Sequence, residues 1–147
     1  KTGPSDETAG TQGAVAALLR TADLLRRRTA AAVACAGLST QQYHVLRILR
    51  RVYPGRIPTL EIGERMIETT PGVTRLLDRL EERGLVDRRR GSEDRRVVLC
   101  AITAPGMDLL ATLDAAVVAA DRRSLSALSS EELGSLLASL ERIQATP

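Results

Sequence analysis

Hydrophobic residues recur at helical spacing along most of the chain. From Ala14 to about Ala36, apolar side chains fall three or four residues apart, which places them on one face of a helix. This stripe consists of Val15, Leu18, Leu19, Ala22, Leu25, Ala32 and Val33, with Thr29 as a polar interruption. Residues 1–13, KTGPSDETAGTQG, are polar and show no apolar period, so we expect them to form a mobile tail.

Capping residues mark the starts of three further helices. Ser39 is followed three residues later by Gln42, and Ser129 by Glu132, which is the spacing of a capping box. Thr103 is a third candidate N-cap. Together with the apolar spacing behind each of them, these signals predict helices at about 39–52, 104–126 and 130–144.

Two shorter helices are predicted between these. Thr59 is a candidate cap for a helix that runs to about Met66. Thr70 is a candidate cap for the next helix, with Pro71 at its first position, where the missing N–H of proline costs nothing. An apolar face follows, and Gly84 is placed to end the helix in the left-handed conformation. That face consists of Val73, Leu76, Leu77 and Leu80.

Beyond Gly84 the pattern changes from helix to strand. Leu85–Arg90 and Arg95–Ile102 predict two strands, joined by a polar turn over residues 91–94. Leu85 also stands where a Schellman motif would fold it onto Leu80. Two short helices with a tight turn between them, followed by a basic hairpin, are typical of a winged helix-turn-helix.

The segment TPGVTRLLDRLEERGLVDRRRGSEDRRVVLCAITAPG, residues 70–106, resembles the MarR-type (multiple antibiotic resistance) winged-helix transcription regulators. The residues that carry the resemblance are Thr74-Arg75, Leu80-Glu81, Gly84-Leu85-Val86, Asp94-Arg95-Arg96, Ile102-Thr103 and Gly106, in this order and spacing. The resemblance implies a mainly α-helical fold of six helices with a small β-wing, which dimerises through its N- and C-terminal helices. It also implies a single domain over residues 14–147. The winged lobe would span about 38–103, and the dimerisation helices about 14–36 and 104–145.

The same resemblance implies how double-stranded DNA would bind. A homodimer would read a near-palindromic duplex, with the second short helix in the major groove and the hairpin wing in the minor groove. By position, Arg96 resembles the wing arginine of the family and Asp94 the acid that orients it, while Thr40 and Gln41 fall where the family contacts phosphate. The residues expected at the DNA are Thr40, Gln41, Pro71, Gly72, Thr74, Arg75, Arg79, Arg89, Arg90, Asp94, Arg95 and Arg96.

A pocket for a small effector is the third implication of the resemblance. It would lie between the dimer helices and each winged lobe, and small aromatic or phenolic acids are the expected ligands. Arg27, Tyr43 and His44 are the candidate partners for such a molecule. A packed or surface position for His44 is the alternative, since a lone histidine is more often structural.

Charge supports a nucleic-acid partner independently. Of the 21 basic residues, 20 are arginines, whose guanidinium fork suits phosphate and guanine. Residues 1–96 carry 18 basic and 12 acidic side chains, a net charge of +6, whereas residues 97–147 carry 3 and 6, a net charge of −3.

The first turns of the expected recognition helix hold Arg75 and no acid, so its N-terminus is open to an external phosphate. The alternative is a solvated helix face with pairs of opposite charge.

Composition argues against several other functions. Two tyrosines and no Trp or Phe disfavour modules that stack single-stranded bases on aromatic rings. One histidine and two separate cysteines, Cys35 and Cys100, offer no zinc ligand set, and we interpret both cysteines as small hydrophobic residues. No nucleophile motif or phosphate-cradling loop supports an enzyme. Without a run of 18 apolar residues or a signal peptide, we expect a cytoplasmic protein that has no cofactor and no membrane contact.

The sequence therefore predicts a ligand-responsive, DNA-binding transcription regulator that acts as a homodimer and, in our interpretation, as a repressor. The alternative hypothesis is a helical interaction protein that keeps the fold without specific DNA binding. The leucine-rich stretches 107–120 and 133–143 leave a related question open, because they suit either a dimer interface or a core within one chain.

Overall fold

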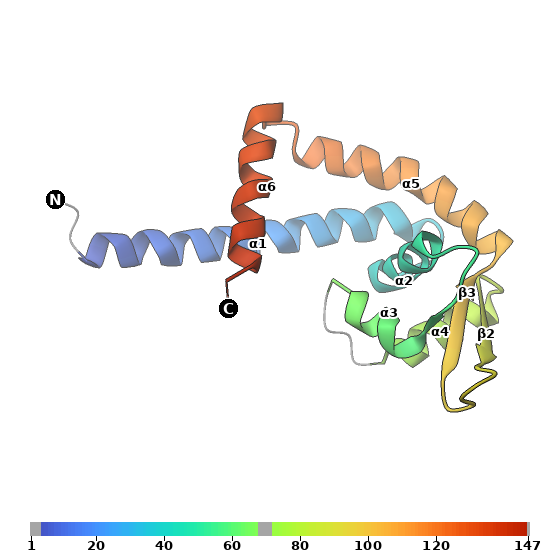
Figure 1. The fold of residues 1–147 in the computed structure, drawn as a ribbon. Coiled ribbons are helices and arrows are strands. Elements are labelled where there is room, and N and C mark those ends of the chain that lie inside the picture. The colour runs from blue at the N-terminus through green and yellow to red at the C-terminus, as the bar shows by residue number, and fades with distance from the viewer. Residues whose placement is uncertain (1–3, 68–71, 147) are drawn as a thin grey trace.

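Six helices and a three-stranded antiparallel sheet make up the part of the chain that the computed structural model describes, residues 4–67 and 72–146 (Figure 1). The helices are α1 (Pro4–Ala34), α2 (Thr40–Arg51), α3 (Thr59–Arg65), α4 (Val73–Glu82), α5 (Ala104–Ser124) and α6 (Ser130–Gln144). The strands are β1 (Ile57–Pro58), β2 (Val86–Arg90) and β3 (Val98–Ile102), and β3 lies between the other two. The expected mainly α-helical fold with a β-wing is confirmed.

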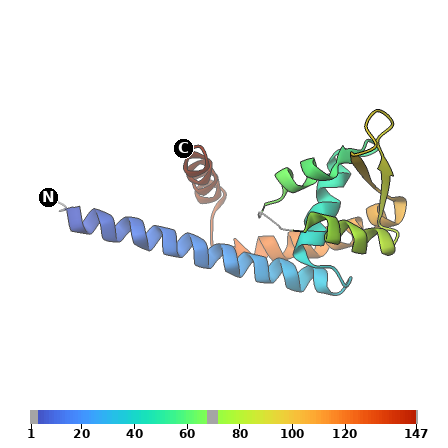
Figure 2. The ribbon, with the colours of Figure 1, turned by 90° about the horizontal axis from the view of Figure 1, so that it is seen from below.

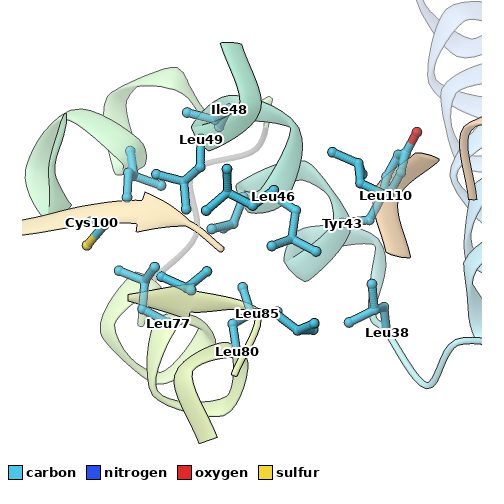
Figure 3. Close-up of a cluster of buried hydrophobic side chains, with 14 of the residues drawn as sticks. Leu38, Tyr43, Leu46, Ile48, Leu49, Leu77, Leu80, Leu85, Cys100 and Leu110 are labelled. Carbon is cyan, nitrogen blue, oxygen red and sulfur yellow. The ribbon is translucent and has the colours of Figure 1, made fainter. Parts of the chain in front are cut away.

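The hydrophobic core lies where α2, α4, α5 and the sheet meet (Figure 3). Leu46 and Leu49 of α2 and Leu77 and Leu80 of α4 are fully buried there, and Leu110 of α5 closes the cluster. Each such side chain contributes about 1.5–3 kcal/mol by leaving water. The core therefore holds α4 by its apolar face and leaves the opposite face of the helix exposed to solvent.

The predicted caps account for the starts of α2, α5 and α6 and for the end of α4. In the capping box of α2, the Gln42 N–H donates to Ser39 Oγ (3.1 Å) and the Ser39 N–H donates to Gln42 Oε1 (2.9 Å). The Ser129 box of α6 has the same pattern. Gly84 ends α4 with φ 69°, and the Leu85 N–H donates to the Leu80 carbonyl at 2.9 Å, which is the Schellman bond.

The predicted start of α4 is wrong. Its N-cap is Gly72, with φ 98°, and the helix begins at Val73 rather than at Pro71. Thr70 and Pro71 themselves lie outside the described residues. Glycine tolerates this left-handed backbone, which most other residues avoid, and it lets the chain turn sharply before the helix.

Two other predicted helix starts also need correction. The hydroxyl of Thr59 does not cap α3, because it donates across to the Val98 carbonyl of β3 at 3.3 Å. Helix α1 begins at Pro4 and not near Ala14, so the segment expected to be a tail is helical from Pro4 onward. Residues 8–15 are exposed, and because they pack on nothing in this chain, no apolar period marks them.

The wing is a hairpin of β2 and β3 with Val86 opposite Ile102 and Arg90 opposite Val98. Strand β3 is shorter than predicted, because Arg95 and Arg96 belong to the turn. Thr103 joins the wing to α5: its hydroxyl accepts from the Gly106 N–H (3.2 Å) and donates to the Gly84 carbonyl (2.6 Å).

Helices α1, α5 and α6 extend away from the winged lobe (Figures 1 and 2). Helix α5 packs along the C-terminal half of α1, and its Leu113 and Val117 are buried, so this stretch closes a core within the chain. Helix α6 has no buried residue, and Figure 2 shows it standing apart from α1. Large apolar side chains are exposed on both helices, namely Val15, Leu18, Leu19 and Leu24 on α1 and Leu136, Leu137 and Ile143 on α6.

Candidate nucleic-acid interface

Helix α4 presents a basic face to solvent. Leu77 and Leu80 are buried against the core, while Thr74, Arg75 and Arg79 on the other side are exposed. Among the described residues, no carboxylate pairs with Arg75 or Arg79. The first turn contains no acid, so the exposed N–H groups and the positive end of the helix dipole both favour an anion.

The wing adds a second group of exposed arginines. Arg89 and Arg90 lie at the end of β2, and Arg95 and Arg96 lie in the turn that follows. Arg89 donates to Asp87 at 3.1 Å, whereas no carboxylate of the described chain pairs with Arg90, Arg95 or Arg96. The wing therefore carries free guanidinium groups at its tip.

Asp94 shapes the wing turn in a way that the sequence did not predict. Its carboxylate accepts the backbone N–H of Arg96 at 2.8 Å, and no contact to the Arg96 guanidinium accompanies that bond in the described structure. The Gly91 N–H donates to the Val97 carbonyl (2.9 Å) and the Val97 N–H to the Asp94 carbonyl (3.1 Å), which close the same turn. Asp94 thus holds the backbone at Arg96 rather than its fork.

Helix α2 contributes Thr40 and Gln41 at its N-terminus. Both are half-buried, and the first turn of the helix has no acidic residue. Of the twelve residues expected at the DNA, eleven lie in the described structure, on the ends of α2 and α4 and on the wing. Pro71 lies outside it.

Three arginines that the sequence did not single out hold these elements together. Arg88 of β2 binds Asp78 and Glu81 of α4, and Arg56 binds the Asp87 side chain at the base of the wing. Arg83, just after α4, donates to the carbonyls of Ala36 (2.8 Å) and Gly37 (3.1 Å) at the end of α1. These pairs join residues from different elements, so no local spacing in the sequence indicates them.

A groove of about 850 Å³ lies between α1, the start of α2 and the residues after α3. Arg27 and His44 line it, together with Met66 and Ile67. Tyr43 does not, which corrects its expected place: it is 1% exposed, and its hydroxyl donates to Asp114 of α5 at 3.3 Å. Burial is the main reason that the pKa of Tyr43 is raised.

The two cysteines occupy different environments. Cys100 of β3 is fully buried, as expected for a small hydrophobic residue, and burial raises the pKa of its thiol. Cys35, just after α1, is exposed, so its interpretation as a small hydrophobic residue is not matched by a place in the core. No helix among the described residues is long and apolar enough to cross a membrane.

Comparison with known proteins identifies this arrangement. The sequence model of the MarR family matches residues 38–98, which run from the start of α2 to the first residue of β3. The HTH-type transcriptional regulator MhqR of Bacillus subtilis is 30% identical over 107 residues, covering 73% of this chain and 72% of that protein. The chain belongs to the MarR family.

Solved MarR structures share the fold over most of the chain. A MarR transcription factor from Planctomyces limnophilus is 41% identical, with 89% of this chain and 95% of that chain covered and a TM-score of 0.72. A mutant MarR from Escherichia coli complexed with operator DNA is 21% identical, with 86% and 89% covered and a TM-score of 0.77, a likeness of fold. As a MarR-family member, the protein is a DNA-binding transcription regulator with a winged helix-turn-helix.

Proposed function

We propose that this MarR-family protein is a homodimeric, ligand-responsive repressor of a near-palindromic operator. Helix α4 of each copy lies in a major groove and each wing in the adjacent minor groove. The observation that carries the proposal is the row of exposed guanidinium groups without carboxylate partners among the described residues, Arg75 and Arg79 on α4 and Arg90, Arg95 and Arg96 on the wing. A dimer that covers promoter DNA in this way denies the same duplex to RNA polymerase.

The individual contacts follow from where each residue lies. Arg75, near the start of α4, reaches a base edge, where an arginine–guanine pair discriminates by about 1–3 kcal/mol. Gly72 and Thr74 are small and let the backbone approach closely. Arg96 enters the minor groove, whose width and potential it senses. We assign Thr40 and Gln41 to phosphate, and Arg89, Arg90 and Arg95 to the phosphates beside the wing. Pro71 and Arg79 we assign to the major groove together with the recognition helix, and Asp94 shapes the turn.

The second copy covers the apolar surface that one chain leaves open. Leu19 of α1 is 65% exposed and Leu137 of α6 is 58% exposed, although both belong to leucine-rich helix faces. Exposed apolar side chains of this size on two helices are typical of a surface that a partner covers. Closed two-fold pairing of identical copies then presents two winged lobes to a palindrome.

The effector occupies the groove lined by Arg27 and His44. Its volume of about 850 Å³ lies in the usual range for small-molecule sites, and apolar Met66 and Ile67 line it beside Arg27. Arg27 pairs with Asp23 of the same groove, so an aromatic carboxylate would share or replace that partner. Thermal-shift titration with benzoate and hydroxybenzoates tests this. We expect stabilisation that is lost in Arg27→Ala, and no stabilisation by any of these acids would contradict it.

DNA selection from a random duplex library, followed by titration of the selected duplex and a scrambled one at two salt concentrations, tests the DNA-binding role. Arg75→Ala should relax the preference at one base pair of each half-site. Arg96→Ala should weaken binding to both duplexes and reduce the salt slope by about 1, because one phosphate-region contact is lost. A protein that selects no sequence and binds no duplex would instead be the helical interaction protein considered above.

A further inference from the structure

Helix α4 has an acidic face turned toward the wing, in addition to the basic face turned toward solvent. Asp78 and Glu81 lie three residues apart and so share one side of the helix. Arg88, in the middle of β2, reaches both of them. Its Nε and Nη2 donate to Glu81 Oε2 at 2.8 and 2.5 Å, and Nη2 also lies 2.6 Å from Asp78 Oδ1.

We propose that Arg88 is a positioning residue that fixes the angle between the recognition helix and the wing. Through that angle it sets the distance along the DNA between the base pairs that α4 contacts in the major groove and those that the wing contacts in the minor groove. This inference rests on the proposed function, because it requires α4 and the wing to touch the same half-site. Arg88 itself touches no DNA in this arrangement.

The contact has the properties of a structural clamp. The Arg88 side chain is 21% exposed, against 70% for its neighbour Arg89, so its guanidinium is largely withdrawn from the surface that DNA would meet. The hydrogen bond to Glu81 is the main cause of its raised pKa. The same bonds to Glu81 and Asp78 hold the guanidinium against α4.

The guanidinium makes this connection through Nε and Nη2, and Nη2 contacts both carboxylates. Its planar fork donates from several nitrogens in fixed directions and so bridges two carboxylates at once, whereas a lysine ammonium is a single point charge on a flexible stem. The bridge restrains both position and twist, because its acceptors lie almost one helical turn apart on α4. Besides the Schellman turn and the apolar packing of Val86 and Ile102 in the same core cluster as Leu80, it is the ion-pair connection between the hairpin and α4 in the described structure.

The test separates geometry from charge and from fold stability. Arg88→Lys keeps the charge and loses the fork, and Glu81→Gln removes one acceptor. Glu82→Gln is the matched control, since Glu82 is exposed on the same helix and makes no ion pair within the described structure. The probes are the duplex that the wild-type protein selects, a scrambled duplex, and two duplexes in which the wing-contacted base pairs move one step inward or outward.

Wild-type protein and Glu82→Gln should prefer the selected duplex over both shifted duplexes by roughly fivefold or more, as for a single mismatched position. Arg88→Lys and Glu81→Gln should reduce this preference to less than about twofold. Their salt slopes should stay unchanged. For scrambled DNA, Arg88→Lys should bind as tightly as the wild-type protein, and Glu81→Gln as tightly as Glu82→Gln.

Two results would overturn the inference while leaving the proposed function intact. One is an unchanged spacing preference with a lowered melting temperature, which would make Arg88 a stabilising residue only. The other is a salt slope reduced by about 1 in a variant that removes the charge, Arg88→Gln, which would make it a phosphate contact. A wild-type protein that selects no duplex would overturn the proposed function and this inference together.

Discussion

At the scale of single residues, Gly106 stands at a position that has no room for a β-carbon. It lies in the first turn of α5, where a β-carbon would stand 2.3 Å from the Leu85 carbonyl oxygen and 2.8 Å from Ile102 Cγ1. Real β-carbons do not approach a backbone atom so closely. The first turn of α5 can therefore pack against the backbone of Leu85, just before β2, only because residue 106 has no side chain. The junction between the winged lobe and the long helices depends on this contact.

We expect Gly106→Ala to lower the free energy of unfolding by about 1–3 kcal/mol, the usual cost of overpacking. Gly134→Ala in α6 is the control, because a β-carbon there meets nothing within 4 Å. That substitution should raise the stability by about 0.5–1 kcal/mol through the better helix propensity of alanine. Urea unfolding of both variants measures the difference, and equal effects would show that the close approach is not rigid.

The two cysteines should differ in reactivity by their burial. In native protein at pH 8, a thiol reagent such as Ellman's should modify Cys35 and leave Cys100 unmodified, because Cys100 is inaccessible and burial raises its pKa. Unfolding in urea should expose both. Absorbance at completion gives the number of thiols, and Cys35→Ser should reduce the native value to none. A fast-reacting thiol in native Cys35→Ser would contradict the buried position.

At the scale of elements, ion pairs hold the wing to the lobe, and one of them makes the stability depend on pH. Arg56 and Asp87 pair at the base of the hairpin, and the hydrogen bond from Arg56 is the main reason that the pKa of Asp87 lies below its usual range. A carboxyl group with a lowered folded-state pKa stabilises the fold above its unfolded pKa of about 3.9. That contribution is lost as the pH falls through the lower, folded-state pKa.

Asp87→Asn should therefore have a lower melting temperature than the wild-type protein at pH 6. The loss in the free energy of unfolding should be no more than about 1 kcal/mol, because the ion pair is partly exposed. The difference should begin to shrink below about pH 4, the pKa of the unfolded chain, and disappear once the pH has fallen through the lower folded-state pKa. Thermal melting at several pH values measures it, with Asp108→Asn on the exposed side of α5 as the control. A difference that stays constant down to pH 2.5 would mean that packing of Asp87, rather than its charge, is responsible.

Local signals in the sequence predict most elements, and long-range contacts account for what they miss. Ser39, Ser129 and Gly84 act on backbone groups within a few residues, so their spacing alone locates the ends of three helices. Thr59 has the right chemistry for a cap but bonds to β3 instead, because the sheet brings a carbonyl into reach. The expected arginine surface can be predicted from composition and order. The clamp by Arg88 cannot, since it depends on the packing of β2 against α4.

At the scale of the whole molecule, one chain leaves a large apolar surface uncovered on α1 and α6. We expect removal of residues 129–147 to abolish tight operator binding, since helix α6 buries none of its side chains within the chain and its leucines are the proposed dimer contacts. Light scattering after size-exclusion chromatography measures the assembly. A truncated protein that is monomeric, soluble and fully competent for DNA would refute the proposed dimer.

A point substitution gives the same test without removing a helix. Leu137→Glu should lower the fraction of dimer at a given concentration, because a charge would be buried in the interface. Ser135→Glu is its control on the same helix, two residues away and so on nearly the opposite side. Equal dissociation of the two variants would place the interface elsewhere on the molecule.

Helix α1 is long enough that a small rotation of the helix displaces its far end by several ångströms. Its 31 residues span about 46 Å, so a tilt of about 5° at one end moves the other by about 4 Å, roughly the step between base pairs. Arg83 joins the turn that follows α1 to the end of the recognition helix through the carbonyls of Ala36 and Gly37. In the proposed dimer, an effector that turned α1 by a few degrees would therefore bring the two recognition helices out of phase with the double helix.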